Sequence, residues 1–247
     1  MKDILQDVVS HTHALGFLTL VKVTSDSNET TIDSMADDRS VILSSTTHNK
    51  VSEFEGTFGM PNLDKLALHL KNPEYQKDAK LEVVKADRNG ETIPTHIHFE
   101  NSSGDFQNDY RFMNKQIIEE KLKTVKFKGA QWNVSFKPSV AAINRMKLQS
   151  AAHSEEPTFN VKTEETGGAT DLIFSFGDAA THAGSFVFQN AVEGELNHTW
   201  SWPVAQVQSI LNLNGELTMS ISDQGAMQIT VDSGMAKYDY ILPAQSK

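Results

Sequence analysis

The sequence contains no cysteine. Disulfide-stapled scaffolds, thiolate metal sites and cysteine nucleophiles are therefore excluded, and the composition fits a reducing compartment. No apolar run reaches the roughly 20 residues that a membrane-spanning helix needs. The first ten residues include Asp3 and Asp7 where a secretory signal would have an apolar core. We therefore expect a cytoplasmic protein with no membrane partner.

Recognisable catalytic motifs are also missing. No Gly-rich phosphate loop precedes a helix with lysine, and no serine or threonine lies in a nucleophile motif. His96 and His98 would share one face of a strand and could be two metal ligands, but further ligands at suitable spacing are missing. An exposed strand face is the alternative interpretation. The sequence predicts a protein without enzymatic activity, metal or cofactor.

Charge is distributed unevenly along an acidic chain whose formal net charge is −10. Residues 1–110 have a net charge of −8, residues 111–147 of +7, and residues 148–247 of −9. An overall negative charge argues against nucleic acid, but the distribution of charge matters more than its sum. The basic centre is either a binding surface or a solvated connector rich in lysine.

A unit of one helix followed by an antiparallel meander organises the end of the chain. Val204, Val207, Ile210 and Leu211 recur at helical spacing, and alternating segments with turns between them follow. Similar units begin near residues 1, 52 and 132, which indicates an internal duplication. The pattern predicts further helices over 3–15, 61–72 and 138–152, and further strands over 17–23, 30–36, 40–46, 52–58, 80–86, 92–99, 105–113, 132–136, 158–164, 171–178 and 184–192.

This order predicts an α+β protein of two similar domains, 1–113 and 132–247, each with two helices packed on antiparallel sheet. The residues of a charged connector over 114–131 follow neither the helical nor the strand pattern of apolar positions. We expect this connector to be extended over 124–128. Leu68 is expected on the apolar side of the second helix, and Val140 and Leu148 on that of the third. Meanders leave unpaired edge strands, which an oligomer could seal strand to strand.

Three segments resemble the sliding clamps, and particularly the processivity clamps of tailed bacteriophages. KYDYILPAQSK at 237–247 resembles the closing strand and proline-containing tail of that family. WNVSFKPSVAAINRMKLQSAA at 132–152 is similar to the strand and helix that open its second domain. TTIDSMADDRSVILSST at 30–46 resembles its paired strands after the first helix. The order of helices and meanders extends the resemblance over nearly the whole chain.

The resemblance implies a DNA clamp fold that closes head to tail into a homotrimeric ring. Helices of such a ring line a hole around duplex DNA, which they bind without reading its sequence. The implied function is that of a DNA polymerase processivity factor in DNA replication, which an ATP-driven clamp loader places on DNA in an infected bacterial cell. The candidate DNA-facing residues are Lys2, Lys65, His69, Lys71, Arg145 and Lys147. An ordinary solvated helix face is the alternative for each of them.

The resemblance also implies a pocket between the connector and the second domain. In the family this pocket takes apolar anchors from the tails of polymerases and clamp loaders. Residues that match its walls are Met35, Val41, Ile117, Ile118, Leu122, Tyr240, Leu242 and Pro243. Plain core packing is the alternative for each of these side chains.

Two other classes of protein stay open. One is an oligomeric β-rich virion or assembly protein without a DNA function. The other is a hydrolase whose active site is dispersed across loops. Oligomeric mass and polymerase run length separate these classes from a clamp.

Overall fold

The structure is a computed structural model that describes residues 1–88, 90–123, 127–178, 180 and 182–245. Two compact units divide the chain. Unit 1 comprises Met1–Val125 together with Ser233–Tyr238, and unit 2 comprises Lys126–Asp232 together with Asp239–Lys247. Six residues of the C-terminal half of the chain therefore belong to the N-terminal unit.

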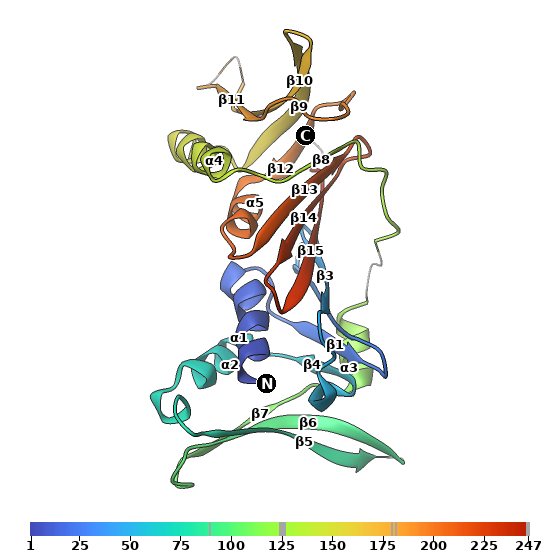
Figure 1. Cartoon of the computed structure of the whole chain (residues 1–247), viewed down its shortest axis with the longest axis vertical. Helices are drawn as coiled ribbons and strands as arrows, with labels where there is room; N and C mark the ends of the chain where they lie inside the picture. The colour runs from blue at the N-terminus through green and yellow to red at the C-terminus, as the bar shows by residue number, and fades with distance from the viewer. Residues whose placement is uncertain (89, 124–126, 179, 181, 246–247) are drawn as a thin grey trace. The chain divides into compact units, whose positions relative to one another are not determined.

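Unit 1 contains two antiparallel sheets and three α-helices (Figure 1). Four strands of the first sheet follow one another in the order β4-β1-β2-β3, and the second is a three-stranded sheet with the order β5-β6-β7. The elements are α1 (Lys2–His11), β1 (Val21–Ser25), β2 (Thr30–Met35), β3 (Ile42–Thr47), β4 (Gly56–Met60), α2 (Leu63–Lys71), β5 (Lys80–Arg88), β6 (Glu91–Glu100), β7 (Gln107–Arg111) and α3 (Lys115–Lys121). Short 3-10 helices lie at His13–Leu15, Ser52–Phe54 and Pro73–Tyr75.

The core of unit 1 lies between its first two helices and its strands. α1 and α2 contact each other, and the apolar residues of each recur every three or four positions, so one side of each helix is buried. Strands of both sheets contribute Val21, Val23, Ile97 and Phe99, all fully buried. With their apolar sides in the core, the two helices turn their polar sides to solvent.

Unit 2 repeats this arrangement with α4 beside α5 (Figure 1). It contains a four-stranded sheet with the order β11-β10-β9-β12, and the run of strands β15-β14-β13-β8 from the largest sheet. The elements are β8 (Val134–Phe136), α4 (Val140–Ala152), β9 (Thr158–Thr166), β10 (Ala169–Phe176), β11 (Gly184–Gln189), β12 (Trp200–Pro203), α5 (Val204–Leu211), β13 (Glu216–Ser222), β14 (Ala226–Asp232) and β15 (Ala236–Pro243). The residues of β15 from Asp239 onward belong to unit 2, and those before it belong to unit 1. Stacked rings of Phe174 and Phe188, 4.1 Å apart, lie in its core.

The predicted α+β class, with two helices against antiparallel sheet in each half, is confirmed. Some elements differ. The strand expected over 52–58 begins as a 3-10 helix, because Phe54 turns into the core. α3 forms inside the connector where no regular structure was expected, and residues 124–126 of its predicted extended segment lie outside the described residues. None of the described helices is both long and apolar enough to cross a membrane.

Candidate nucleic-acid interface and partner pocket

α2 turns two lysine side chains to solvent. Lys65 and Lys71 are both exposed, whereas Leu63, Leu66 and Leu70 of the same helix are buried. His69, the third candidate on this helix, is half-buried, with its ring 5.1 Å from that of Phe99. Burial, followed by the charge of Lys65, lowers the pKa of His69 below its ordinary 6.5. Burial therefore disfavours the charged form of this imidazole.

Lys2 on α1 is held by its own unit. Its Nζ donates hydrogen bonds to the carbonyl oxygen of Tyr75 at 2.9 Å and to Oε1 of Gln76 at 3.0 Å. These contacts join positions more than 70 residues apart in the sequence, so no local pattern reveals them. A DNA contact by Lys2 would have to compete with both hydrogen bonds, and it remains a prediction.

Of the two helices of unit 2, α4 is the one that contains basic residues. Arg145 is exposed and Lys147 is half-buried. α5 has no basic residue, and its Gln208 accepts a hydrogen bond from Ser150 of α4 at 3.2 Å. Of the six predicted DNA-facing side chains, the three that are exposed cations are therefore Lys65, Lys71 and Arg145. Their contact with DNA remains a prediction.

A cavity of about 730 Å³ in unit 1 contains two of the predicted pocket residues. Met35, the last residue of β2, and Leu122, which follows α3, both line it. Among the apolar residues of the wall that were not predicted are Leu20 just before β1 and Met113 just after β7. An apolar residue immediately outside a strand is the signal that could have identified them. The polar part of the lining includes His13, Asp37, Arg39, Asp64 and Lys121.

The other predicted pocket residues have different surroundings. Val41, Ile118, Tyr240 and Leu242 are fully buried. The backbone carbonyl of Leu242 accepts a 3.0 Å hydrogen bond from the buried indole of Trp202, within unit 2. Ile117 is 42 % exposed, and Pro243 is exposed. The four buried side chains pack in the interior, which is the alternative that sequence patterns could not exclude.

α3 reaches the cavity wall because β4 has a glycine at the contact. A Cβ atom on Gly59 would lie 2.8 Å from Cδ1 of Ile118, much closer than side-chain atoms approach one another. Asn114 caps the helix, since its side-chain oxygen accepts a 2.9 Å hydrogen bond from the backbone amide of Ile117. The cap and the close contact together fix the helix that ends beside Leu122.

A second cavity, of about 900 Å³, lies between β4 and β6 in unit 1. Phe58 and Phe112 line it with their rings stacked 4.2 Å apart, and Lys85, Thr92 and Lys115 contribute polar groups. It contains none of the residues predicted for the partner pocket, and it therefore offers control positions.

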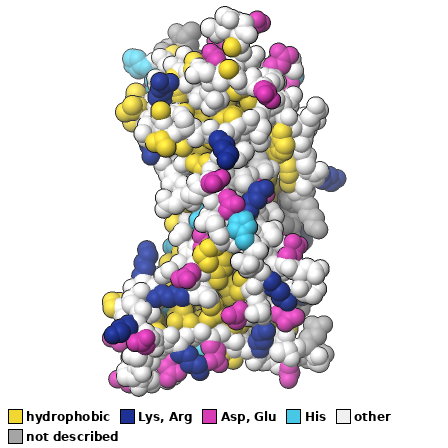
Figure 2. Space-filling model, in the orientation of Figure 1, with side chains coloured by type: hydrophobic (Ala, Val, Ile, Leu, Met, Phe, Trp, Pro, Cys, Tyr) yellow, Lys and Arg dark blue, Asp and Glu magenta, His cyan; other side chains and the backbone are white. Residues whose placement is uncertain are grey.

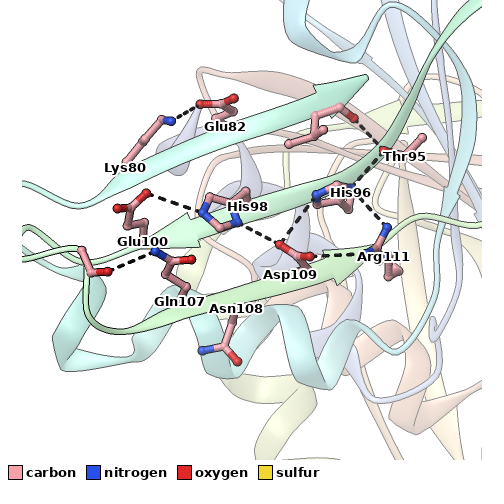
Figure 3. Close-up of polar contacts among 12 residues, drawn as sticks. Lys80, Glu82, Thr95, His96, His98, Glu100, Gln107, Asn108, Asp109 and Arg111 are labelled. Atoms are coloured by element: carbon pink, nitrogen blue, oxygen red, sulfur yellow. Dashed lines mark hydrogen bonds and ion pairs between the residues drawn. The ribbon is translucent and has the colours of Figure 1, made fainter. Parts of the chain in front are cut away.

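His96 and His98 belong to a polar network on the exposed face of β6 and β7 (Figure 3). His98 Nδ1 donates to Oδ1 of Asp109 at 2.8 Å, and His96 Nε2 lies 3.6 Å from the same oxygen. The hydrogen bond from His98 holds the pKa of Asp109 below 3.8, whereas burial lowers the pKa of His96 below 6.5. Arg111 Nη2 completes the network, 3.4 Å from Asp109 Oδ2.

Both histidines therefore have partners within this network: Asp109 lies beside each of them, and Arg111 lies beside His96. Within the described ranges, no three or more His, Asp or Glu side chains are arranged to hold a metal ion. Both histidine side chains are half-buried on one side of β6 and β7.

Comparison with solved structures places the whole chain beside proteins called PCNA, or proliferating cellular nuclear antigen. A PCNA of A. fulgidus, solved with the C-terminal region of FEN-1, has a TM-score of 0.69 and 11% identity, over 100% of this chain and 96% of its own. The PCNA of Thermococcus kodakaraensis has a TM-score of 0.67 and 10% identity, over 99% and 97%. The PCNA of Entamoeba histolytica has a TM-score of 0.64 and 12% identity, over 99% of this chain and 94% of its own. No protein-family model and no curated protein matches the sequence.

Proposed function

We propose that this chain, which has the fold of the sliding clamps, forms a ring that encircles duplex DNA and tethers the replicative DNA polymerase during processive synthesis. The observation that carries the proposal is the match to PCNA over the full length of the chain, with 96% of the A. fulgidus protein covered in return. The exposed cations on α2 and α4 support the DNA contact. An ATP-driven clamp loader opens and closes the ring, and the protein itself catalyses no reaction.

Free strand edges support closure of the ring. β11 is an edge strand in unit 2, and its sequence GSFVFQ contains no charged residue and no proline. Edge strands that remain in solvent are usually protected by charge, proline or a bulge. The pairing of β11 with β10 is irregular at Phe188, but the regular part of β11, Gly184–Val187, has neither charge nor proline and is suited to pairing with another copy. β7 is a free edge in unit 1. Pairing of β7 with β11 of the next copy is heterologous, and three copies of a two-unit chain close a ring of six similar units.

The charge distribution suits DNA that must slide. Lys65, Lys71 and Arg145 attract phosphates without reading bases, because phosphate contacts contain no sequence information. Residues 1–110 and 148–247 are acidic, with net charges of −8 and −9. Acidic surface repels DNA elsewhere and therefore favours the helix faces as the single contact region.

The cavity beside Met35 and Leu122 is the proposed docking site for partner tails. The A. fulgidus PCNA was solved with the C-terminal region of FEN-1 bound, so a similar fold does accept such a segment. By analogy, apolar anchors from the polymerase and the clamp loader occupy this cavity, where desolvation of a few large side chains supplies most of the affinity. The resemblance of 237–247 to phage clamps supports an origin in a tailed bacteriophage and a role in its bacterial host.

Polymerase run length tests this function. With the cognate polymerase, clamp loader and ATP on primed circular DNA, adding the protein should lengthen the products severalfold. Omission of ATP is the control, because it prevents loading and leaves the polymerase intact. An oligomeric protein that never lengthens the products would instead belong to the class of assembly proteins.

A further inference from the structure

The three most exposed large hydrophobic side chains of the described residues lie on the two helices that contain the exposed cations. Leu68 on α2 is 68% exposed, and Val140 and Leu148 on α4 are 75% and 72% exposed. The sequence pattern placed all three on the buried sides of their helices, and the structure shows that this expectation was wrong. Large aliphatic side chains that remain in solvent at such levels often mark a contact surface.

Each helix has already filled its core-facing side with other residues. α2 buries Leu63, Leu66 and Leu70, so Leu68 can turn inward only if those leucines turn out. α4 buries Ile143 and Met146, and the same constraint applies to Val140 and Leu148. The exposed aliphatic side chains are therefore a fixed property of the outward faces.

The aliphatic side chains lie next to the cations on each helix. Leu68 comes three residues after Lys65 and three before Lys71, so the three side chains share one side of α2. Leu148 comes three residues after Arg145 on α4. Figure 2 shows hydrophobic (yellow) and basic (dark blue) side chains beside one another over α4. The exposed acid on α2, Asp64, lies in the first turn, where the helix dipole favours it.

We infer, on the basis of the proposed function, that Leu68, Val140 and Leu148 contact the deoxyribose edges of duplex DNA directly. Charge selects this occupant, because the neighbouring Lys65, Lys71 and Arg145 attract phosphates and repel a basic protein segment. Every nucleotide presents the same sugar, so an apolar contact with it is independent of sequence, as sliding requires.

This contact differs physically from the attraction of phosphates by lysine. Neutralised phosphates release counterions, so that part of the affinity falls as salt rises. Burial of an aliphatic side chain against a sugar releases no ion and depends weakly on salt. The helix faces therefore combine a long-range, salt-sensitive attraction with a short-range, salt-insensitive contact.

Affinity for a duplex of about 30 base pairs, measured by fluorescence anisotropy at a series of KCl concentrations, separates the two contributions. The double variant Leu68→Gln with Leu148→Gln keeps helix propensity and side-chain length. We expect it to weaken binding about tenfold at every salt concentration with an unchanged salt slope, since partial burial of two leucines supplies about 1.4 kcal/mol. The variant Lys65→Ala with Lys71→Ala should instead flatten the slope, by about 0.9 for each phosphate that is no longer neutralised.

Met235→Gln is the matched control. Met235 is an apolar residue whose exposed fraction is 37%, and it lies outside the helices. It should leave affinity and slope unchanged. Unchanged affinity in the leucine variant would overturn the inference, as would a fall in its oligomeric mass, which would show that the leucines pack between copies. If the lysine variant also bound DNA like the unmodified protein, the proposed function itself would fail.

Discussion

The phenol of Tyr238 donates a 2.8 Å hydrogen bond to Oδ2 of Asp7, although 231 residues separate the two in the sequence. Ser233 Oγ donates to the same oxygen at 2.9 Å, and the ring of Tyr238 stacks on His11 at 4.3 Å. α1 thus holds the segment Ser233–Tyr238 inside unit 1. Unit 1 is completed by residues from the far end of the chain.

Removal of this hydroxyl should destabilise unit 1. Tyr238→Phe keeps the stacked ring but deletes a hydrogen bond to a charged group, so we expect the free energy of unfolding to fall by about 1.5–3 kcal/mol. Urea denaturation followed by circular dichroism measures the change. Ser27→Ala, in an exposed loop, is the control. A variant as stable as the unmodified protein would show that the contact between Tyr238 and Asp7 does not hold the segment in place.

The same contact predicts how stability depends on pH. Burial alone would raise the pKa of Asp7, but hydrogen bonds from His11, Tyr238 and Ser233 together lower it below the ordinary 3.8. A depressed carboxyl pKa stabilises the folded state above pH 3.8, and this contribution is lost as the pH falls through the folded-state value. Asp7→Asn should therefore be less stable at neutral pH, with a difference that narrows as the pH falls below 3.8. A difference that stays constant across that range would contradict the assignment.

The contact between Gly59 and Ile118 should control the partner pocket. Gly59→Ala places a methyl group 2.8 Å from Cδ1 of Ile118, so α3 must shift, and the wall at Leu122 shifts with it. We expect binding of a polymerase tail peptide, measured by calorimetry, to weaken by about tenfold, the effect of a reduction of roughly 1.4 kcal/mol in binding free energy. Adding Ile118→Ala should recover part of the affinity, because it removes the clash.

Thr92→Glu in the second cavity of unit 1 is the control, and it should leave peptide binding unchanged. If Gly59→Ala bound the peptide normally while Thr92→Glu abolished binding, the docking site would lie between β4 and β6 instead.

A charge on the β11 edge should open the ring. Val187→Lys introduces the kind of residue that protects edge strands from pairing, and β11 has none. We expect the solution mass to fall toward the 27.4 kDa of a single chain, as measured by light scattering. Thr218→Lys, on the interior strand β13, should leave the mass at three times that value. An unchanged mass for Val187→Lys would exclude β11 from the interface.

Helices with a regular apolar period were predictable from the sequence. Ile4, Leu5, Val8 and Val9 define the buried side of α1 without any tertiary information. α3 was missed because Ile118 is its only buried residue and most of its other positions are charged or polar. β12 was missed because it has four residues, of which one is Pro203. A local period therefore reveals an element only where that element buries several residues of its own.

Side-chain roles that depend on distant partners could not be predicted. Nothing near Lys2 indicates that the carbonyl of Tyr75 holds its ammonium group. The outward positions of Leu68 and Leu148 depend on which apolar residues occupy the buried side, and a helix with too many apolar residues leaves that choice to packing. Met35 and Leu122 line one cavity of unit 1, but the resemblance to a family supplied their grouping and the residues themselves did not.

Retention on circular DNA is the most direct measurement of whether the protein encloses the duplex. The protein is loaded onto a nicked circle with its clamp loader and ATP, separated from free protein by gel filtration, and then one half of the sample is cut once with a restriction enzyme. A closed ring should remain on the circle for many minutes and leave the linear DNA within seconds by sliding off its ends. Equal retention on both forms would show that the protein binds the surface of DNA without encircling it.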